Sequence, residues 1–580
     1  MVTSVATPRA MRRTLSDRRR GAVRKTDHVW SPISRYWPVA LVVALAAASI
    51  TAGSLRRADH AATARPPAGD GVAPALAAFA GVDPLSAPDC DRSTGRLKIP
   101  VVSAPNCVPL WQKGRDNGGA TSTGVTAREI RIAVYRARVV PTIRAAQEAA
   151  IGHRLPTAAE DDRNRKQSLK VMNNLWETFG RTVRLVTLPA SGADDDEVAA
   201  RADAIRAALE LKVFAVIGGP VGTKAFASEL AARGVICVCT DSLPAESLDR
   251  WAPYVWGVGL SSTQRYELVT ELVAKLDGKP AEYAGGNLTT SKRKFALVYV
   301  DTTDQAQRTG GAYLERLLRR AGVDLAMTIS YVFDLSSLQE NAGTMVARMK
   351  QGGVTSIIFA GEPWMPYYLG VQATSEAWFP EWVLAGTGYT DLTISGRRYD
   401  QRQWRHAFGI SSQTAPLTPA AQERAGNFLS WYLGAKLSSY PNLTELTTLF
   451  TGIQLAGPHL TPETFRDGLF SYLPTRHQVT SVATSWGKHD RSGGPDYAAA
   501  HDATLVWWDA DAVGPHELQS DGQTGRGMYR YVDGGRRYLP GELRSARPRF
   551  FDPAGTVLLL ADRPPADSTP SYPRRSSRSG

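Results

Sequence analysis

The feature that most constrains this 580-residue chain is a regular alternation of short apolar stretches with amphipathic ones. From Glu129 onward the pattern predicts strands and helices in the order β-α-β-α-β-α-β, and from about residue 263 a similar order starts again. The strands include continuous apolar runs such as VFAVIGG and SIIFAG, which are typical of strands covered on both faces. We therefore predict an α/β protein with two tandem lobes, each a doubly wound parallel sheet, and a cleft between them.

Predicted elements fill most of the chain between residues 124 and 510. The predicted strands lie at 130–135, 182–188, 213–219, 235–240, 294–300, 326–333, 356–361, 381–387 and 503–509. After the second run come helical segments near 418–435, 442–457 and 462–470. We assign residues 124–260 and about 390–470 to lobe one, and 261–389 and about 500–562 to lobe two.

The N-terminal region predicts a membrane anchor. Residues 37–55 carry no charge, and nineteen helical residues are about 28 Å long, close to the thickness of a hydrocarbon core. Arg and Lys residues are more numerous before this segment than directly after it, so residues 1–36 are expected to form a cytoplasmic basic arm and the body to be extracytoplasmic. The alternative is a cleaved signal peptide and a secreted protein, but a 36-residue charged leader favours the anchor.

The net charge of +13 does not indicate nucleic-acid binding. Residues 1–36 hold +7 and residues 563–580 hold +3, which leaves +3 for everything between them. A body with so little net charge lacks the electrostatic footprint of a protein that binds a phosphate backbone. Residues 56–123 are predicted to be a linker with a Cys-bounded loop, and 563–580 a disordered tail.

Four cysteines in an exported chain fit an oxidising compartment. Cys90 and Cys107 flank a Pro-containing loop and are predicted to form a disulfide. Cys237 and Cys239 stand two apart in a predicted strand, where their side chains would be about 7 Å apart, too far for an unstrained bridge. We therefore predict that these two are buried thiols.

Six stretches of the body occur in the same order as the corresponding segments of a known protein family. They are GVTAREIRIAVY (124–135), FAVIGGPVGTKAF (214–226), VICVCTDSLPAES (235–247), PYVWGVGLSSTQ (253–264), FALVYVDTTD (295–304) and SIIFAGEPW (356–364). Together they resemble the type I periplasmic-binding fold, in particular the branched-chain amino-acid-binding branch of ABC-transporter solute receptors. With the anchor, the chain also resembles membrane-tethered receptors of actinobacteria.

The resemblance implies a ligand site between the lobes, at the carboxyl ends of the strands, where helix N-termini donate N–H groups. One jaw would contain Gly219, Pro220, Val221, Gly222, Thr223, Thr240, Asp241 and Ser242. The other would contain Asp301, Asp304, Gln305, Glu362, Trp364, Thr387 and Tyr389. Purely structural roles stay open for these residues, since Gly218 and Gly219 suit a tight turn and Thr223 suits a helix cap.

The sequence departs from the family where an amino-acid receptor would hold the ligand's ammonium group. An acidic residue is expected after the last strand of lobe two, but Thr387 and Gly388 stand there. An unpaired buried ammonium group costs several kcal/mol. We therefore expect a small polar solute without a free α-ammonium group and weak or absent binding of leucine, isoleucine and valine, although Glu362 is an alternative acid. Thr223→Ala and Trp364→Ala are expected to remove binding.

The predicted function is an extracytoplasmic solute receptor for an ABC-type uptake system, with permease subunits as partners and without a catalytic step. The alternatives are an orphan cell-surface sensor or scaffold, or an exported enzyme that reuses the fold. We predict neither a cofactor nor a metal site. His489, Asp490, Asp496, His501 and Asp502 are ligand-type side chains, but they lack HxH or HExxH spacing and are interpreted as a solvated loop.

Overall fold

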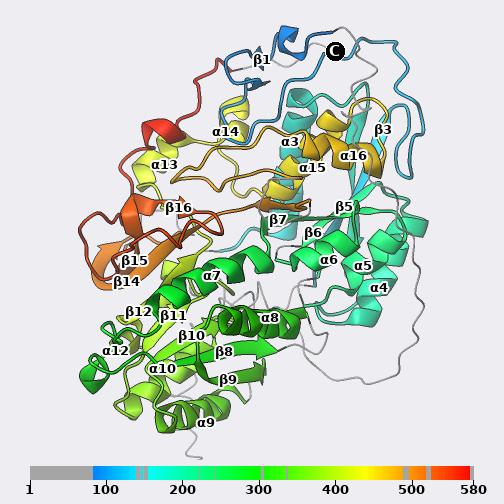
Figure 1. Cartoon of the computed structure of the whole chain (residues 1–580). Coiled ribbons are helices and arrows are strands. Elements are labelled where there is room, and N and C mark those ends of the chain that lie inside the picture. Colours follow the sequence, from blue (N-terminus) through cyan, green and yellow to red (C-terminus); the bar gives the residue numbers. More distant parts are fainter. Residues whose placement is uncertain are drawn as a thin grey trace, which may run out of the picture.

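The computed structural model describes residues 82–138, 141, 144, 148, 154–220, 222–240, 242–301, 306–334, 337–487, 495–517 and 524–574. The predicted arm and anchor, residues 1–55, lie outside this set. Among the helices within it, none combines the length and the apolar character needed to cross a bilayer. Figure 1 shows two α/β lobes, one above the other, and their sheets confirm the predicted fold class.

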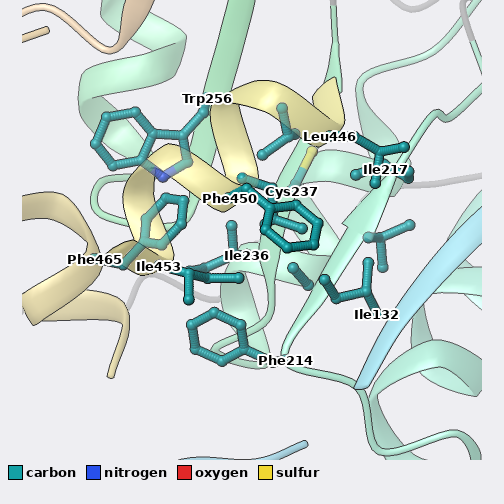
Figure 2. Close-up of a cluster of buried hydrophobic side chains, with 14 of the residues drawn as sticks. Ile132, Phe214, Ile217, Ile236, Cys237, Trp256, Leu446, Phe450, Ile453 and Phe465 are labelled. Atoms are coloured by element: carbon teal, nitrogen blue, oxygen red, sulfur yellow. The ribbon is translucent and has the colours of Figure 1, made fainter. Parts of the chain in front are cut away.

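Lobe one is built on a six-stranded sheet in the order β13-β7-β6-β5-β3-β4, and all of its strand pairs are parallel. Its elements are β3 (Glu129–Arg136), α3 (Ala158–Leu175), β4 (Thr182–Pro189), α4 (Glu197–Ile205), β5 (Ala215–Ile217), α5 (Ala225–Ala232), β6 (Ile236–Thr240), α6 (Ala245–Arg250), β7 (Val255–Leu260), α15 (Leu443–Ala456), α16 (Pro462–Phe470) and β13 (Ala498–Ala500). In Figure 2, Phe450 of α15 and Phe465 of α16 lie in one cluster with Ile236 of β6 and Trp256 of β7. The late helices therefore complete the core of the first lobe.

Lobe two has an eight-stranded sheet whose main path is β15-β14-β12-β11-β10-β8-β9, with β16 paired to β14. Its elements are α7 (Ser262–Leu276), β8 (Phe295–Asp301), α8 (Ala306–Arg320), β9 (Leu325–Val332), α9 (Leu338–Gln351), β10 (Ser356–Ala360), α10 (Met365–Ser375), β11 (Glu381–Leu384), α11 (Thr393–Gly396), α12 (Gln401–Trp404), β12 (Ala407–Ser411), β14 (Ala503–Gly514), β15 (Gly525–Tyr531) and β16 (Arg537–Tyr538). Trp507 and Trp508, adjacent in β14, belong to two separate apolar clusters. Both clusters contain residues of β8, β10, β11 and β14, so this sheet is covered on both faces.

Three connections join the lobes, and they bring together the carboxyl ends of the parallel strands. Between β7 and α7 only Ser261 intervenes, and its hydroxyl caps α7 by accepting from the Gln264 N–H at 3.2 Å. β13 is followed after two residues by β14, whose Thr504 pairs with Ser411, the last residue of β12. The third connection runs from β12 to α15 through α13 (Pro419–Ala425) and α14 (Phe428–Leu433). The carboxyl edges of both sheets thus meet at the hinge.

The structure corrects the predicted boundary at residue 390. β12 pairs in parallel with β11, and α12 packs on α10, so residues 390–411 extend lobe two rather than returning to lobe one. The return begins later, and Phe428 is the first residue after β12 in the core of lobe one. Backbone pairing decided this boundary, because a strand as short as AFGIS carries too weak a periodicity to be recognised in the sequence.

Both predicted irregular segments are partly structured where they are described. Cys90 and Asp91 form β1, which pairs with β2 (Arg96–Leu97), and Leu97 joins the core of lobe one. In the predicted disordered tail, the Tyr572 hydroxyl donates to Asp91 Oδ2 at 2.6 Å. The Trp431 indole donates to the carbonyl of the same tyrosine at 2.9 Å. The segment up to Arg574 is therefore attached to the body and is not the free tail that composition suggested.

The Cys90–Cys107 disulfide is confirmed, whereas the prediction of two buried thiols is wrong. Cys237 and Cys239 are joined to each other, with their Cα atoms 5.0 Å apart. The register between β6 and β7 shifts between Cys237 and Thr240. The 7 Å estimate assumed a regular strand, and this irregularity brings the two residues closer together.

Peptide mapping without reduction checks both pairings. We expect Cys90 and Cys107 in one linked pair of peptides, and the peptide that contains Cys237 and Cys239 lighter by two hydrogens than its reduced form. The reduced sample provides the control. Alkylation of Cys237 or Cys239 in unfolded, unreduced protein would contradict the second bridge, because a disulfide leaves no thiol to react.

Candidate functional site

The lobe-one jaw predicted by the resemblance lies at the carboxyl end of β5 and β6. Gly218 has a φ of +68°, and a β-carbon at Gly219 would lie 2.8 Å from the carbonyl oxygen of Cys239. The turn after β5 therefore needs glycine both for its left-handed backbone and for its contact with β6. Pro220 and Gly222 continue this turn, while Val221 lies outside the described residues.

Three hydroxyl residues of this jaw have different roles. Thr223 is buried, and its Oγ1 accepts from the Ala225 N–H at 3.0 Å, so it satisfies the first N–H group of α5. The Ser242 hydroxyl donates to the carbonyl of Leu260 at 3.1 Å and ties the ends of β6 and β7 together. Only Thr240, the last residue of β6, has a buried hydroxyl without a hydrogen-bond partner in the described structure. Asp241 lies outside the described residues.

Two carboxylates beside this turn were not among the predicted site residues. Asp194 and Asp195 follow β4, and the carbonyl oxygen of Asp194 accepts from the Gly222 N–H at 3.2 Å. A β-carbon at Gly222 would lie 3.0 Å from Cβ of Asp195. Burial and the charge of Asp195 raise the pKa of Asp194 to about 6. The run DDD after a predicted strand was the available signal, because the carboxyl ends of parallel strands share one edge.

The lobe-two jaw contains Glu362, directly after β10, but its carboxylate is already engaged. The Tyr331 hydroxyl donates to Oε1 at 2.8 Å, the Trp364 N–H to Oε2 at 2.5 Å and the Met365 N–H to Oε1 at 3.2 Å. Burial raises the pKa of Glu362 to about 7 despite these bonds. The carboxylate caps the first turn of α10, which argues against the alternative that it binds a ligand ammonium group.

Trp364 is part of the lobe-two core rather than the surface of the cleft. Its side chain is buried among the residues that pack against β10 and β11, and its indole nitrogen has no hydrogen-bond partner in the described structure. Replacing it with alanine would remove a large core side chain, which costs about 3–5 kcal/mol. Trp364→Ala therefore does not isolate ligand binding from folding.

The turn after β11 has an unusual backbone at the position of the missing acid. Gly388 and Tyr389 have φ values of +54° and +59°. A β-carbon at Gly388 would lie 2.5 Å from the carbonyl oxygen of Gly361, and the Thr387 hydroxyl donates to the same oxygen at 3.1 Å. The turns after β10 and β11 are thus locked together. A left-handed tyrosine is uncommon, and such strain tends to occur at functional sites.

The last predicted members of this jaw follow β8. Asp301 ends that strand and is half-buried. Asp304 and Gln305 lie outside the described residues. The structure therefore places every described member of the lobe-two set at or just after the carboxyl end of β8, β10 or β11, on one edge of one sheet, although Glu362 and Trp364 are buried within it.

Two polar side chains of α7 form hydrogen bonds at the hinge. Arg265 of α7 donates to the carbonyl of Gly386 at 2.6 Å, and Gln264 donates to Asp496 Oδ2 at 2.5 Å. His501 lies 3.2 Å from the same carboxylate and 2.9 Å from the Ser485 carbonyl. Burial lowers the pKa of His501, but the hydrogen bond and charge of Asp496 outweigh this effect and raise it.

The residues interpreted as a loop cluster thus take part in the hinge where they are described. The side chains of Asp496 and His501 contact each other, while Asp502 forms an ion pair with Arg537 at 2.9 Å. His489 and Asp490 lie outside the described residues, within which no group of three or more His, Cys, Asp or Glu side chains is placed to hold a metal ion.

No protein-family model matches the chain, and no curated protein matches it. Among solved structures, a periplasmic binding protein from Burkholderia mallei covers 73% of this chain and 97% of its own, with 10% identity and a TM-score of 0.47. An ABC-transporter substrate-binding protein from Aeropyrum pernix covers 72% and 100%, with 10% identity and a TM-score of 0.47. A branched-chain amino-acid transporter substrate-binding protein from Streptococcus pneumoniae, solved with isoleucine, covers 70% and 100%, with 13% identity and a TM-score of 0.43.

Proposed function

We propose that the chain is an extracytoplasmic solute receptor that closes its two lobes over a small polar ligand and delivers it to an ABC-type permease. The observation that carries this proposal is the meeting of both sheets' carboxyl edges at a three-connection hinge. In open α/β sheets, ligands bind outside these strand ends, and two lobes on a hinge can close around them. The family resemblance of the sequence supports the same function.

The proposed location is the outer face of the cell membrane. The uncharged segment 37–55 would anchor the chain, and the linker that follows would hold the lobes away from the bilayer. Two disulfides in the described body agree with an oxidising compartment. Membrane fractionation and protease treatment of intact cells test this location. The body should sediment with the membranes and be cut by protease added outside the cell. A soluble form that begins between residues 53 and 65 would overturn the anchor.

A thermal-shift screen against amino acids, amides, carboxylates and sugars tests the receptor function. A ligand at 100 times its Kd stabilises the native state by about 2.7 kcal/mol, which is readily measured. We expect at least one compound to raise the melting temperature. No shift with any class, together with no ligand carried through purification, would count against a receptor.

Thr240→Trp should remove that shift and leave the fold intact. Thr240 is half-buried at the carboxyl end of β6, and an indole there would occupy the proposed ligand space. The matched control is Thr182→Trp, because Thr182 is exposed at the opposite, amino end of β4. If Thr240→Trp binds the screened compound as wild type does, the site is not at these strand ends.

Weak or absent binding of branched-chain amino acids stays a prediction. Asp194 adds a specific alternative partner for a ligand ammonium group, which the test can distinguish. The other jaw lacks a free acid after β11, but Asp194 and Asp195 are carboxylates beside the Gly219–Thr223 turn. Calorimetry with leucine should show no micromolar binding. Micromolar binding that is lost in Asp194→Asn would instead place the ammonium partner in lobe one.

A further inference from the structure

A cavity of about 880 Å3 lies apart from the residues predicted to bind the solute. Its walls come from α13 and α14, from the loop that follows them as far as Tyr440, and from Met528, Tyr529 and Tyr531 of β15. In Figure 1, α13 and α14 lie on the same side of the molecule as the β14–β15 pair. Of the described residues predicted for the cleft, none lines this cavity.

The cavity has walls from both lobes. β15 belongs to the sheet of lobe two. The opposite loop is bonded to α3 of lobe one, where Asn164 donates to the Ser438 hydroxyl at 2.9 Å and the Ser439 hydroxyl donates to Asp161 at 2.6 Å. A compound in the cavity would therefore contact both lobes without entering the space between the strand ends.

Two polar groups in the wall have no hydrogen-bond partner in the described structure. The Tyr531 side chain is 1% exposed, and its hydroxyl is unpaired. The buried Nε of Arg563 is unpaired as well. By contrast, the neighbouring Tyr529 hydroxyl donates to the Thr390 carbonyl at 2.6 Å and accepts from Trp404 at 3.0 Å. Buried polar groups are nearly always bonded, so these two atoms are unusual, but both are shielded from the cavity itself and would reach a ligand only after a small side-chain movement.

The charges around the cavity favour an anion with a single negative charge. Lys436 and Glu423 are exposed and neutralise each other at 3.0 Å, which leaves Arg563 and Glu517 as the principal opposite charges. Both Glu517 oxygens accept from the Thr393 N–H at 3.0 Å, and burial raises the pKa of this carboxyl. Because Glu517 is an acidic group in the same wall, a ligand with one carboxylate is favoured over a ligand with two.

The remaining lining favours an apolar body on the ligand. Met528, Leu437, Leu558 and the two tyrosine rings contribute apolar surface. A volume of this size lies within the range of about 300–1,000 Å3 found for small-molecule sites. We propose that this cavity is a second ligand site, which takes a small monocarboxylic acid with an apolar body and binds its carboxylate through Arg563.

Calorimetry on the full chain with 3-phenylpropionate tests the site, with the neutral 3-phenylpropanamide as the matched ligand. We expect the acid to bind and the amide to bind at least about ten-fold more weakly, since it cannot form a charge-assisted pair with arginine. Arg563→Gln should weaken binding of the acid by a similar factor. Arg526→Gln is the control, because Arg526 is exposed on β15 and does not line the cavity.

Two further variants separate the cavity from the cleft. Ala420→Trp puts an indole at an exposed position of the cavity wall and should abolish binding even if Arg563→Gln does not fold. Thr240→Trp should leave binding of 3-phenylpropionate unchanged. Absent binding of the acid, equal binding of the amide, or loss in Thr240→Trp with retention in Ala420→Trp would each overturn the second site. The last outcome would place the acid in the cleft and leave the receptor function intact.

Discussion

Replacing Arg537 with alanine should destabilise the protein by about 3–5 kcal/mol, because it removes the buried ion-pair partner of Asp502 and leaves that carboxylate only His477 and the Ala483 N–H. Arg537 and Asp502 both have fully buried side chains, and Nε lies 2.9 Å from Asp502 Oδ1. The same guanidinium donates to the carbonyl of Asp502 at 2.8 Å and to the carbonyl of Gln413 at 2.5 Å. One side chain thus holds two of the three connections between the lobes.

Chemical denaturation of Arg537→Ala and Arg537→Lys measures this effect. Lysine keeps the charge but cannot reproduce the fork of donors, so it should recover only part of the loss. The control is Arg526→Ala, whose partner Asp511 is exposed, and no measurable change is expected there. A loss below about 1 kcal/mol in Arg537→Ala would show that water replaces the pair and that the hinge is more open than the structure.

The second large effect concerns pH and Glu362. Burial raises the pKa of this carboxyl from its ordinary value of 4.5 to about 7, so the folded state holds the proton more tightly than the unfolded state. The resulting stabilisation is fully present below pH 4.5 and is lost as the pH rises through about 7. The shift corresponds to about 3 kcal/mol over that range.

Glu362→Gln should remove this pH dependence. The quantity to measure is the difference in unfolding free energy between wild type and variant from pH 4 to pH 8, which should change by about 3 kcal/mol in favour of the variant at high pH. Asp194 also has a raised pKa, but its contribution is the same in wild type and variant. The difference between the two proteins therefore reports on Glu362 alone. The matched control is Glu376→Gln, at the exposed end of α10, which should follow the wild-type profile. A constant difference across this range would mean that Glu362 is not buried as described.

The alternation of apolar and amphipathic stretches was sufficient to predict the two-lobe fold. Most strands between β3 and β11 begin and end within a few residues of their predicted positions, because a parallel sheet buried on both faces requires continuous apolar runs. The pattern was less informative for α4. Val198 is a large apolar residue of this helix, yet it is 80% exposed, while Ala200 and Ala204 are buried. Alanine side chains are small and let a helix pack closely against its neighbours. A hydrophobicity pattern gives them less weight than larger apolar residues, so it does not identify this face.

The candidate cleft was predictable only in part. A correctly predicted strand also fixes where its carboxyl end lies. Thr240, Asp301 and Thr387 therefore lie on the predicted edges of the sheets. The sequence could not show that Glu362 caps α10 or that Trp364 belongs to the core, because both roles depend on side-chain direction. The DDD run after β4 indicated carboxylates on that edge of the sheet, but the sequence did not show that Asp194 contacts Gly222, because the two residues follow different strands and meet through the order of the sheet.

Local patterns in the sequence therefore determined the class of fold, the order of most elements and the Cys90–Cys107 bridge, since each depends on residues close together in the chain. The tertiary structure decided what depends on how the strands pair and how the elements pack. It placed residues 390–411 in lobe two through pairing with β11, joined Cys237 to Cys239 where the register of β6 shifts, and formed a cavity between α13, α14 and β15. Strand pairing and the packing of elements carry no local periodicity, so only the folded chain reveals them.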